Sequence, residues 1–221
     1  MSSERRVALT FDDGPGPSTA ALLDVLDRHD AKATFFVVGK NLRGAALGDE
    51  SLARALAIRQ LRSGHRLGNH ADSHSRDPMP LAAFVAEIRK VDAMLVELHA
   101  AAGVELPASL PFRLPYGPLV RPKQAMDERL LALTAAGKRH QHWTIILADW
   151  QADARPERLA ARLLEHVETM WALDALPVIV LHDAGAWPRE QGFERAATVA
   201  VVDRLCAELR ARAASFVFPA D

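Results

Sequence analysis

The chain has 221 residues, of which 49% are hydrophobic and 25% charged, and its formal net charge is −1. This composition is typical of a globular domain, and the lack of a basic surplus argues against a partner recognised through its nucleic-acid phosphates. A single cysteine, Cys206, excludes a disulfide framework and a thiolate metal site.

The N-terminal segment MSSERRVALTF has no apolar stretch long enough for a secretory signal, and no later segment reaches the length of a membrane span. The sequence therefore predicts a cytoplasmic protein with no membrane partner. No internal repeat or long linker divides the chain, so we expect one catalytic domain over residues 1–221.

Short apolar segments recur along the chain and predict about seven β-strands. In chain order they are RRVALTF (5–11), ATFFVV (33–38), HRLGN (65–69), LPFRLPY (110–116), HWTIIL (142–147), LPVIVLH (176–182) and ASFVFP (214–219). Segments with helical spacing of apolar residues lie between them, at 52–61, 81–98, 159–167 and 193–209. This alternation predicts an α/β protein with a parallel, barrel-like sheet in a single domain.

Polar residues follow five of these predicted strands. TFDDGP comes after the first, NHADSH after the third, FRLPYG at the fourth, ADW at the fifth and LHD at the sixth. In parallel α/β barrels, active sites form at the C-terminal ends of the strands. We therefore expect these segments to meet at one end of the sheet.

His70 and His74 are spaced so that their imidazoles can converge on one metal ion. The pair alone is also typical of two surface histidines on a loop. Together with Asp13, however, it makes a site of two histidines and one carboxylate that leaves coordination positions open. The DDGP segment could instead form only a turn before a helix at Ser18 or Thr19.

A cation at Asp13 explains why a second carboxylate, Asp12, can stand beside it. Asp12 then remains free to act as a general base, and Arg113 could hold it ionised, although an arginine more often makes a surface salt bridge. His182 is the candidate general acid, with Asp149 as the expected partner and Asp183 as the alternative. A histidine after a buried strand can also be purely structural.

Taken together, the ordered motifs TFDDGP, H-x-x-x-H, R-x-P-Y-G, DW and LHD resemble those of the polysaccharide deacetylase family, that is, carbohydrate esterase family 4 or the NodB-homology domain. They span residues 10–183. The resemblance implies a distorted (β/α) barrel and a divalent metal, usually zinc, that serves to hydrolyse N- or O-acetyl groups on sugars. Cobalt, manganese, iron and nickel would suit the same ligands.

The resemblance also implies a role for each matched residue. Asp13, His70 and His74 would bind the metal, Asp12 would be the general base and His182 the general acid. The remaining roles are secondary: Arg113 would orient Asp12, Asp149 would tune His182, the backbone N–H of Tyr116 would stabilise an oxyanion, and Trp150 and Leu181 would line an acetyl pocket. Two positions depart from the family pattern, Ala71 where Ser or Thr is usual and Ile146 where an additional Asp is frequent.

These observations predict a metal-dependent hydrolase that removes an acetyl group from an N-acetylated sugar, a short oligosaccharide or a related small amide. Alternatives are an esterase acting on O-acetyl groups and a deacetylase of a non-carbohydrate amide. A non-haem iron oxygenase would share the two-histidine, one-carboxylate site, but it leaves Asp12 and His182 without a role. A catalytically silent sugar-binding protein would be expected to have lost a ligand or the base, and neither is missing.

Overall fold

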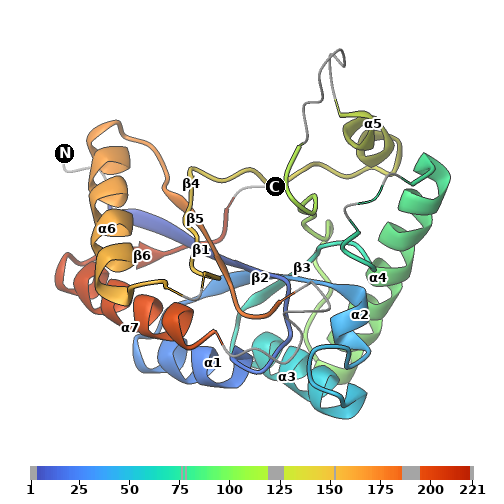
Figure 1. Cartoon of the computed structure of the whole chain (residues 1–221), viewed down its shortest axis with the longest axis horizontal. Helices are drawn as coiled ribbons and strands as arrows, with labels where there is room; N and C mark the ends of the chain where they lie inside the picture. The colour runs from blue at the N-terminus through green and yellow to red at the C-terminus, as the bar shows by residue number, and fades with distance from the viewer. Residues whose placement is uncertain are drawn as a thin grey trace.

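The computed structural model describes residues 4–75, 77, 79–118, 127–151, 153–185 and 195–219. Within them, parallel strands form one sheet in the order β3-β2-β1-β5-β4, with β6 paired to β1 (Figure 1). The strands are β1 (Arg6–Asp12), β2 (Ala33–Val37), β3 (Arg66–Asn69), β4 (Ile145–Ile146), β5 (Val178–His182) and β6 (Ser215–Phe216). The predicted parallel α/β architecture is therefore confirmed.

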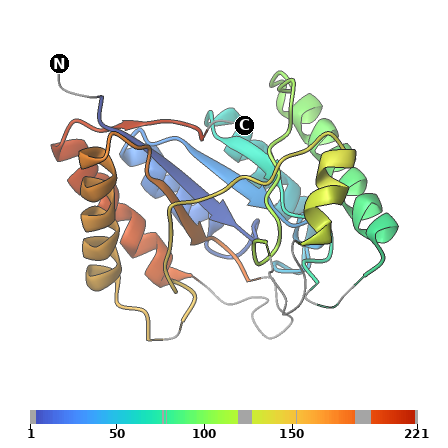
Figure 2. The ribbon, with the colours of Figure 1, turned by 90° about the horizontal axis from the view of Figure 1, so that it is seen from above.

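Helices join successive strands. They are α1 (Thr19–Arg28), α2 (Gly39–Leu42), α3 (Glu50–Arg62), α4 (Leu81–Ala102), α5 (Glu128–Ala135), α6 (Pro156–Ala172) and α7 (Ala196–Ala211). Figure 2 shows α6 and α7 at one end of the sheet and α4 and α5 at the other. The helical segments predicted at 52–61, 81–98 and 159–167 lie within α3, α4 and α6. The predicted start of the last helix, at Phe193, lies outside the described residues.

The two faces of the sheet differ because successive side chains of a strand point in opposite directions. Phe11, Phe35 and Leu181 belong to the main hydrophobic core, which also contains buried side chains of α1, α4, α6 and α7. The alternate positions of β1, Thr10 and Asp12, face the other side. One face of the sheet therefore anchors the helices, and the other carries polar side chains toward the strand ends.

The segment 110–116 differs from the predicted strand. Only Phe112 makes bridges, in parallel with Asn69 on one side and His140 on the other. Pro111 and Pro115 flank this position and have no N–H to donate, so a longer ladder of hydrogen bonds cannot form. The segment nevertheless extends the sheet beyond β3, which brings Arg113 to the same end as the C-termini of β1 and β3.

None of the helices in the described part of the chain combines the length and apolar character needed to cross a membrane.

Candidate active site

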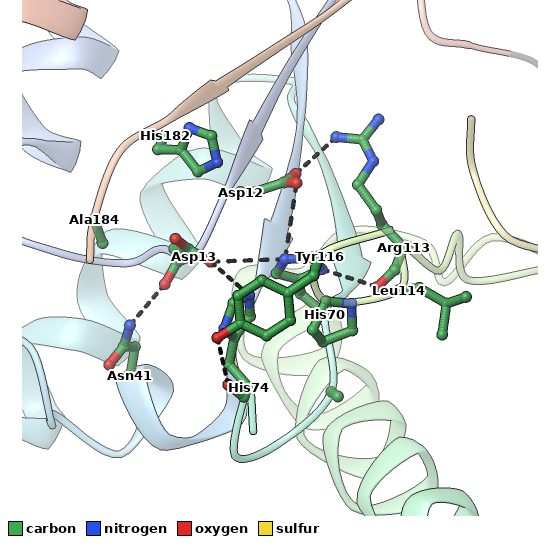
Figure 3. A network of polar contacts seen from close by, with 12 residues as sticks. Asp12, Asp13, Asn41, His70, His74, Arg113, Leu114, Tyr116, His182 and Ala184 are labelled. Atoms are coloured by element: carbon green, nitrogen blue, oxygen red, sulfur yellow. Dashed lines mark hydrogen bonds and ion pairs between the residues drawn. The ribbon is translucent and has the colours of Figure 1, made fainter. Parts of the chain in front are cut away.

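The strand ends bring the predicted polar residues together. Asp12 ends β1 and is in register with His182, which ends β5, so both side chains lie on the same face of the sheet. His70 follows β3, and Arg113 follows the bridge at Phe112. Figure 3 shows these side chains converging from separate elements on the space around Asp12 and Asp13.

Asp13, His70 and His74 form a compact cluster of buried ligand atoms. One donor atom from each residue lies within 4.8 Å of the other two. The Asp13 Oδ1 atom is 3.2 Å from His74 Nε2 and 3.6 Å from His70 Nε2. This oxygen has no hydrogen-bond partner among the described residues, which leaves it available as a ligand beside the two imidazoles.

The hydrogen bonds behind the two histidines define which ring nitrogen faces Asp13. His70 Nδ1 lies 2.8 Å from the Arg113 carbonyl oxygen, which can only accept, so Nδ1 carries the proton. His74 Nδ1 lies 3.1 Å from the Tyr116 hydroxyl, which itself donates to the His74 carbonyl. Both Nε2 atoms therefore present lone pairs toward Asp13.

Burial keeps both rings neutral, since it lowers the pKa of His70 to about 4 and that of His74 to about 3. Burial also raises the pKa of the Asp13 carboxyl above its ordinary value. Two lone pairs and a carboxylate oxygen repel one another unless a cation joins them. The donor set, its burial and its tautomers thus fit a divalent metal such as zinc.

The loop from 70 to 74 is fixed by side chains outside it. Asn69 Oδ1 accepts the Ala71 N–H at 2.8 Å, and Glu87 accepts the N–H of Ser73 at 3.2 Å. Ala71 and His74 have φ angles of 61° and 52°, a backbone conformation that residues other than glycine rarely adopt. Ala71 departs from the family pattern, but the Asn69 amide holds its backbone in place. Strain of this kind is common at functional sites.

Asp12 and Arg113 form a buried ion pair. The Arg113 Nη1 atom donates to Asp12 Oδ1 at 2.7 Å and to Thr10 Oγ1 at 2.8 Å, and Arg113 is fully buried. Burial alone would raise the pKa of Asp12, but Arg113, together with His70 and His182, holds it below the ordinary value. The ion pair of Arg113 is therefore buried, unlike the surface salt bridge that an arginine most often makes.

His182 pairs with Asp149 and not with the neighbouring Asp183. Asp149 Oδ1 is 2.8 Å from His182 Nδ1, and its Oδ2 accepts the His182 backbone N–H at 2.8 Å. Burial would lower the pKa of His182, but the charge of Asp149 and its hydrogen bond outweigh burial and raise that pKa to about 9. Asp183 instead accepts a hydrogen bond from Thr19 at 2.5 Å and faces Gly14, so it supports the turn after β1.

The predicted pocket residues occupy different places. The Trp150 ring lies 4.8 Å from the His182 ring, edge to face, and is 39% exposed. Tyr116 lies against His74, with ring centroids 4.6 Å apart, and has a φ angle of 63°. Leu181 is different: its side chain is fully buried in the main core, on the face of β5 opposite to His182.

The placement of Leu181 corrects the sequence-based expectation. A residue adjacent to His182 in a strand must point away from it, whereas Val180 shares its face. The alternation of side-chain direction along a strand follows from the sequence alone, and it favours Val180 over Leu181 as the residue on the His182 face. For Trp187, which follows His182 in the segment AWPREQG, the sequence leaves a sugar-stacking contact and a loop anchor equally open, and it lies outside the described residues.

Two further residues support the site without any motif that marks them. Asn41, in α2, donates to the Asp13 carbonyl at 2.7 Å and so fixes the turn that carries the carboxylate. Thr198, in α7, donates to Asp149 Oδ2 at 2.6 Å. Both come from elements distant in sequence from their partners, and no spacing pattern in the sequence indicates them.

The family model described as polysaccharide deacetylase matches residues 1–133 of this chain. Among curated proteins, the chain is 32% identical over 182 residues to a peptidoglycan-N-acetylglucosamine deacetylase of Bacillus cereus, which covers 81% of this chain and 60% of the relative. It is 33% identical to a chitooligosaccharide deacetylase of a Bradyrhizobium strain, over 100% of this chain and 86% of the relative.

Solved structures show the same fold. A polysaccharide deacetylase from Bacillus cereus superposes with a TM-score of 0.68 at 26% identity, covering 99% of this chain and 93% of that one. A family 4 carbohydrate esterase from Streptomyces lividans, solved with acetate, gives a TM-score of 0.69 at 24% identity over 97% of this chain and 93% of that one. The likeness extends over nearly the whole chain, beyond the residues that the family model matches.

Proposed function

Since the chain belongs to the polysaccharide deacetylase family, we propose that it is a metal-dependent hydrolase that removes the acetyl group from an N-acetylated amino sugar in an oligosaccharide. The observation that carries this proposal is the convergence of the Asp13, His70 and His74 ligand atoms beside two separate proton-transfer groups, Asp12 with Arg113 and His182 with Asp149. Hydrolysis of an amide by metal-activated water uses a metal site, a base and an acid, and these three units supply them.

Asp13, His70 and His74 would hold the metal, which supplies a Lewis acid that polarises the acetyl carbonyl and lowers the pKa of a water. Asp12 accepts a proton from that water as the water oxygen bonds to the carbonyl carbon. Asp12 is suited to this step because Arg113 keeps its carboxylate ionised and oriented. The Tyr116 backbone N–H supports the oxyanion that then develops.

His182 completes the reaction by protonating the leaving nitrogen as the carbon–nitrogen bond breaks. The products are acetate and a free amine. Asp12 then releases the proton it accepted to solvent, and His182 takes one up, which restores both groups for the next turnover. Asp149 keeps His182 protonated at neutral pH and aims its ring, since its carboxylate binds both the Nδ1 and the backbone N–H. Trp150, edge to face with His182, provides an apolar wall for the acetyl methyl group.

The substrate class rests on the relatives. Two of them are named for deacetylating peptidoglycan N-acetylglucosamine and chitooligosaccharides, and the second spans this whole chain. Another relative is named as a bifunctional xylanase/deacetylase, so O-acetyl esters belong in any test. The Bacillus cereus relative is longer than this chain, which spans 60% of its length.

The experiment is acetate release from a panel of acetylated compounds by zinc-loaded protein. The panel comprises chitooligosaccharides, peptidoglycan fragments, acetylated xylan, free N-acetylglucosamine and a small N-acetyl amine. We expect release from the oligosaccharide amides that is abolished in Asp12→Asn and retained in Asp30→Asn, which makes the same change at an exposed carboxyl. Release from xylan alone, or none from any compound by folded, metal-loaded protein, would overturn the proposal.

A further inference from the structure

Thr198 is a buried hydroxyl on an otherwise apolar helix face. The buried side chains of α7 are Thr198, Val201, Val202, Leu205, Cys206 and Leu209, and Thr198 is fully buried. A hydroxyl in such a place costs free energy unless it has a hydrogen-bond partner. Its partner is the Asp149 carboxylate, at 2.6 Å.

The Asp149 carboxylate is held at three points. Its Oδ2 accepts hydrogen bonds from Thr198 and from the His182 backbone N–H, and its Oδ1 accepts from His182 Nδ1. Two anchors on Oδ2 leave the carboxylate little freedom to rotate about its Cβ–Cγ bond. The rotation they allow is the one that aims Oδ1 at the His182 ring.

The residue that precedes α7 also fixes the backbone just after Asp149 and just after His182. Arg195, which precedes the helix, donates through Nη1 to the Trp150 carbonyl and through Nε to the Ala184 carbonyl, both at 3.2 Å. These carbonyls follow Asp149 and His182 by one and two residues. At the start of α7, Thr198 therefore binds the Asp149 side chain, and Arg195 binds the backbone that follows Asp149 and His182.

We propose that Thr198 is a positioning residue for the acid step, which locks the Asp149 carboxylate in the orientation that aligns the His182 ring. This inference rests on the proposed hydrolase, in which His182 protonates the leaving nitrogen. Among the described residues, the Thr198 hydroxyl donates to Asp149 and to none of Asp13, His70 and His74. Its loss therefore lowers the rate of the chemical step and leaves substrate binding unchanged.

The test compares Thr198→Val, which keeps the shape and removes the hydroxyl, with Thr198→Ser, which restores a hydroxyl. On the best substrate of the panel we expect kcat to fall about tenfold in Thr198→Val, with KM within about twofold, and to recover in Thr198→Ser. Thr169→Val, at an exposed threonine of α6, serves as the matched control and is expected to leave kcat unchanged. Thr198→Ala replaces the valine variant should the latter not fold.

A second readout needs no catalysis. The Nδ1 proton of His182, shared with Asp149, should give a far-downfield proton resonance that disappears in His182→Gln. We expect this resonance to move upfield or to broaden in Thr198→Val and to persist in Thr198→Ser. An unchanged resonance in Thr198→Val overturns the inference even if the protein proves inactive on every acetylated compound. An equal loss of kcat in the serine and valine variants overturns it as well.

Discussion

The Arg113 guanidinium lies 2.7 Å from the Asp12 carboxylate, and both groups are buried at the C-terminal end of the parallel sheet. The two residues are separated by a long stretch of sequence, and their pairing requires β1 and the bridge at Phe112 to lie in one sheet. Removing one partner leaves a buried charge uncompensated, which is far more costly than losing a surface ion pair.

Arg113→Met is therefore expected to lower the free energy of unfolding by about 3–5 kcal/mol. The double variant Arg113→Met with Asp12→Asn should recover part of this loss, because it removes the second charge too. Urea denaturation of the three proteins measures both effects. Equal stabilities of wild type and Arg113→Met would show that the pair is not buried as described.

The activity of the protein should fall at alkaline pH, because His182 must carry a proton to act as the acid. Asp149 raises the pKa of His182 to about 9, and a bound cation repels the imidazolium, so we place the alkaline limb at or just below pH 9. Asp149→Asn removes the charge that raises this pKa and should move the limb toward 6.5. The pH dependence of kcat/KM measures the shift, and an alkaline limb that is the same in both proteins contradicts the assignment of His182.

Tyr116 is expected to contribute to metal affinity through its hydroxyl. The hydroxyl lies 3.1 Å from His74 Nδ1 and fixes the tautomer in which Nε2 is free to bind. Partners of this kind typically change metal affinity by about 10- to 100-fold. We expect Tyr116→Phe to weaken zinc binding by that factor in a competition titration with a chelator. Arg129→Gln, which alters a neighbouring contact to the Gly117 carbonyl, should leave the affinity unchanged.

The correction at Leu181 leads to opposite expectations for adjacent residues. Leu181→Ala removes a fully buried core side chain and should cost about 2–5 kcal/mol of stability while leaving KM unchanged. Val180→Ala alters the face of β5 that carries His182 and should change KM or kcat. Thermal unfolding and steady-state kinetics of both variants separate the two effects. A change of KM in Leu181→Ala alone would return that residue to the pocket.

Much of the fold and of the site could be predicted from the sequence because both depend on local patterns. The apolar strand β1 leads directly into Asp12 and Asp13, and the largely buried strand β3 leads in the same way into His70. Parallel strands align their C-terminal ends, so residues that follow them must meet. The pairing of His182 with Asp149, preferred over Asp183, agrees with the structure.

Other features depend on contacts that no local pattern encodes. The prolines at 111 and 115 limit an apolar segment to one bridging residue, Phe112, although its hydrophobic pattern favours a strand. Thr198 and Asn41 reach the site from helices whose packing angle decides which side chain arrives there. The hydrogen bonds that set the tautomers of His70 and His74 come from the segment 113–116, and only the assembled sheet brings that segment to the two rings.

The most direct test of the account is to titrate the metal-free protein with zinc and to follow metal binding and acetate release from a chitooligosaccharide on the same samples. We predict that both rise together and level off at one equivalent of zinc, and that His74→Ala abolishes both while the fold persists. Full acetate release by the metal-free protein in the presence of chelator, or tight one-to-one binding of zinc by His74→Ala, would contradict it.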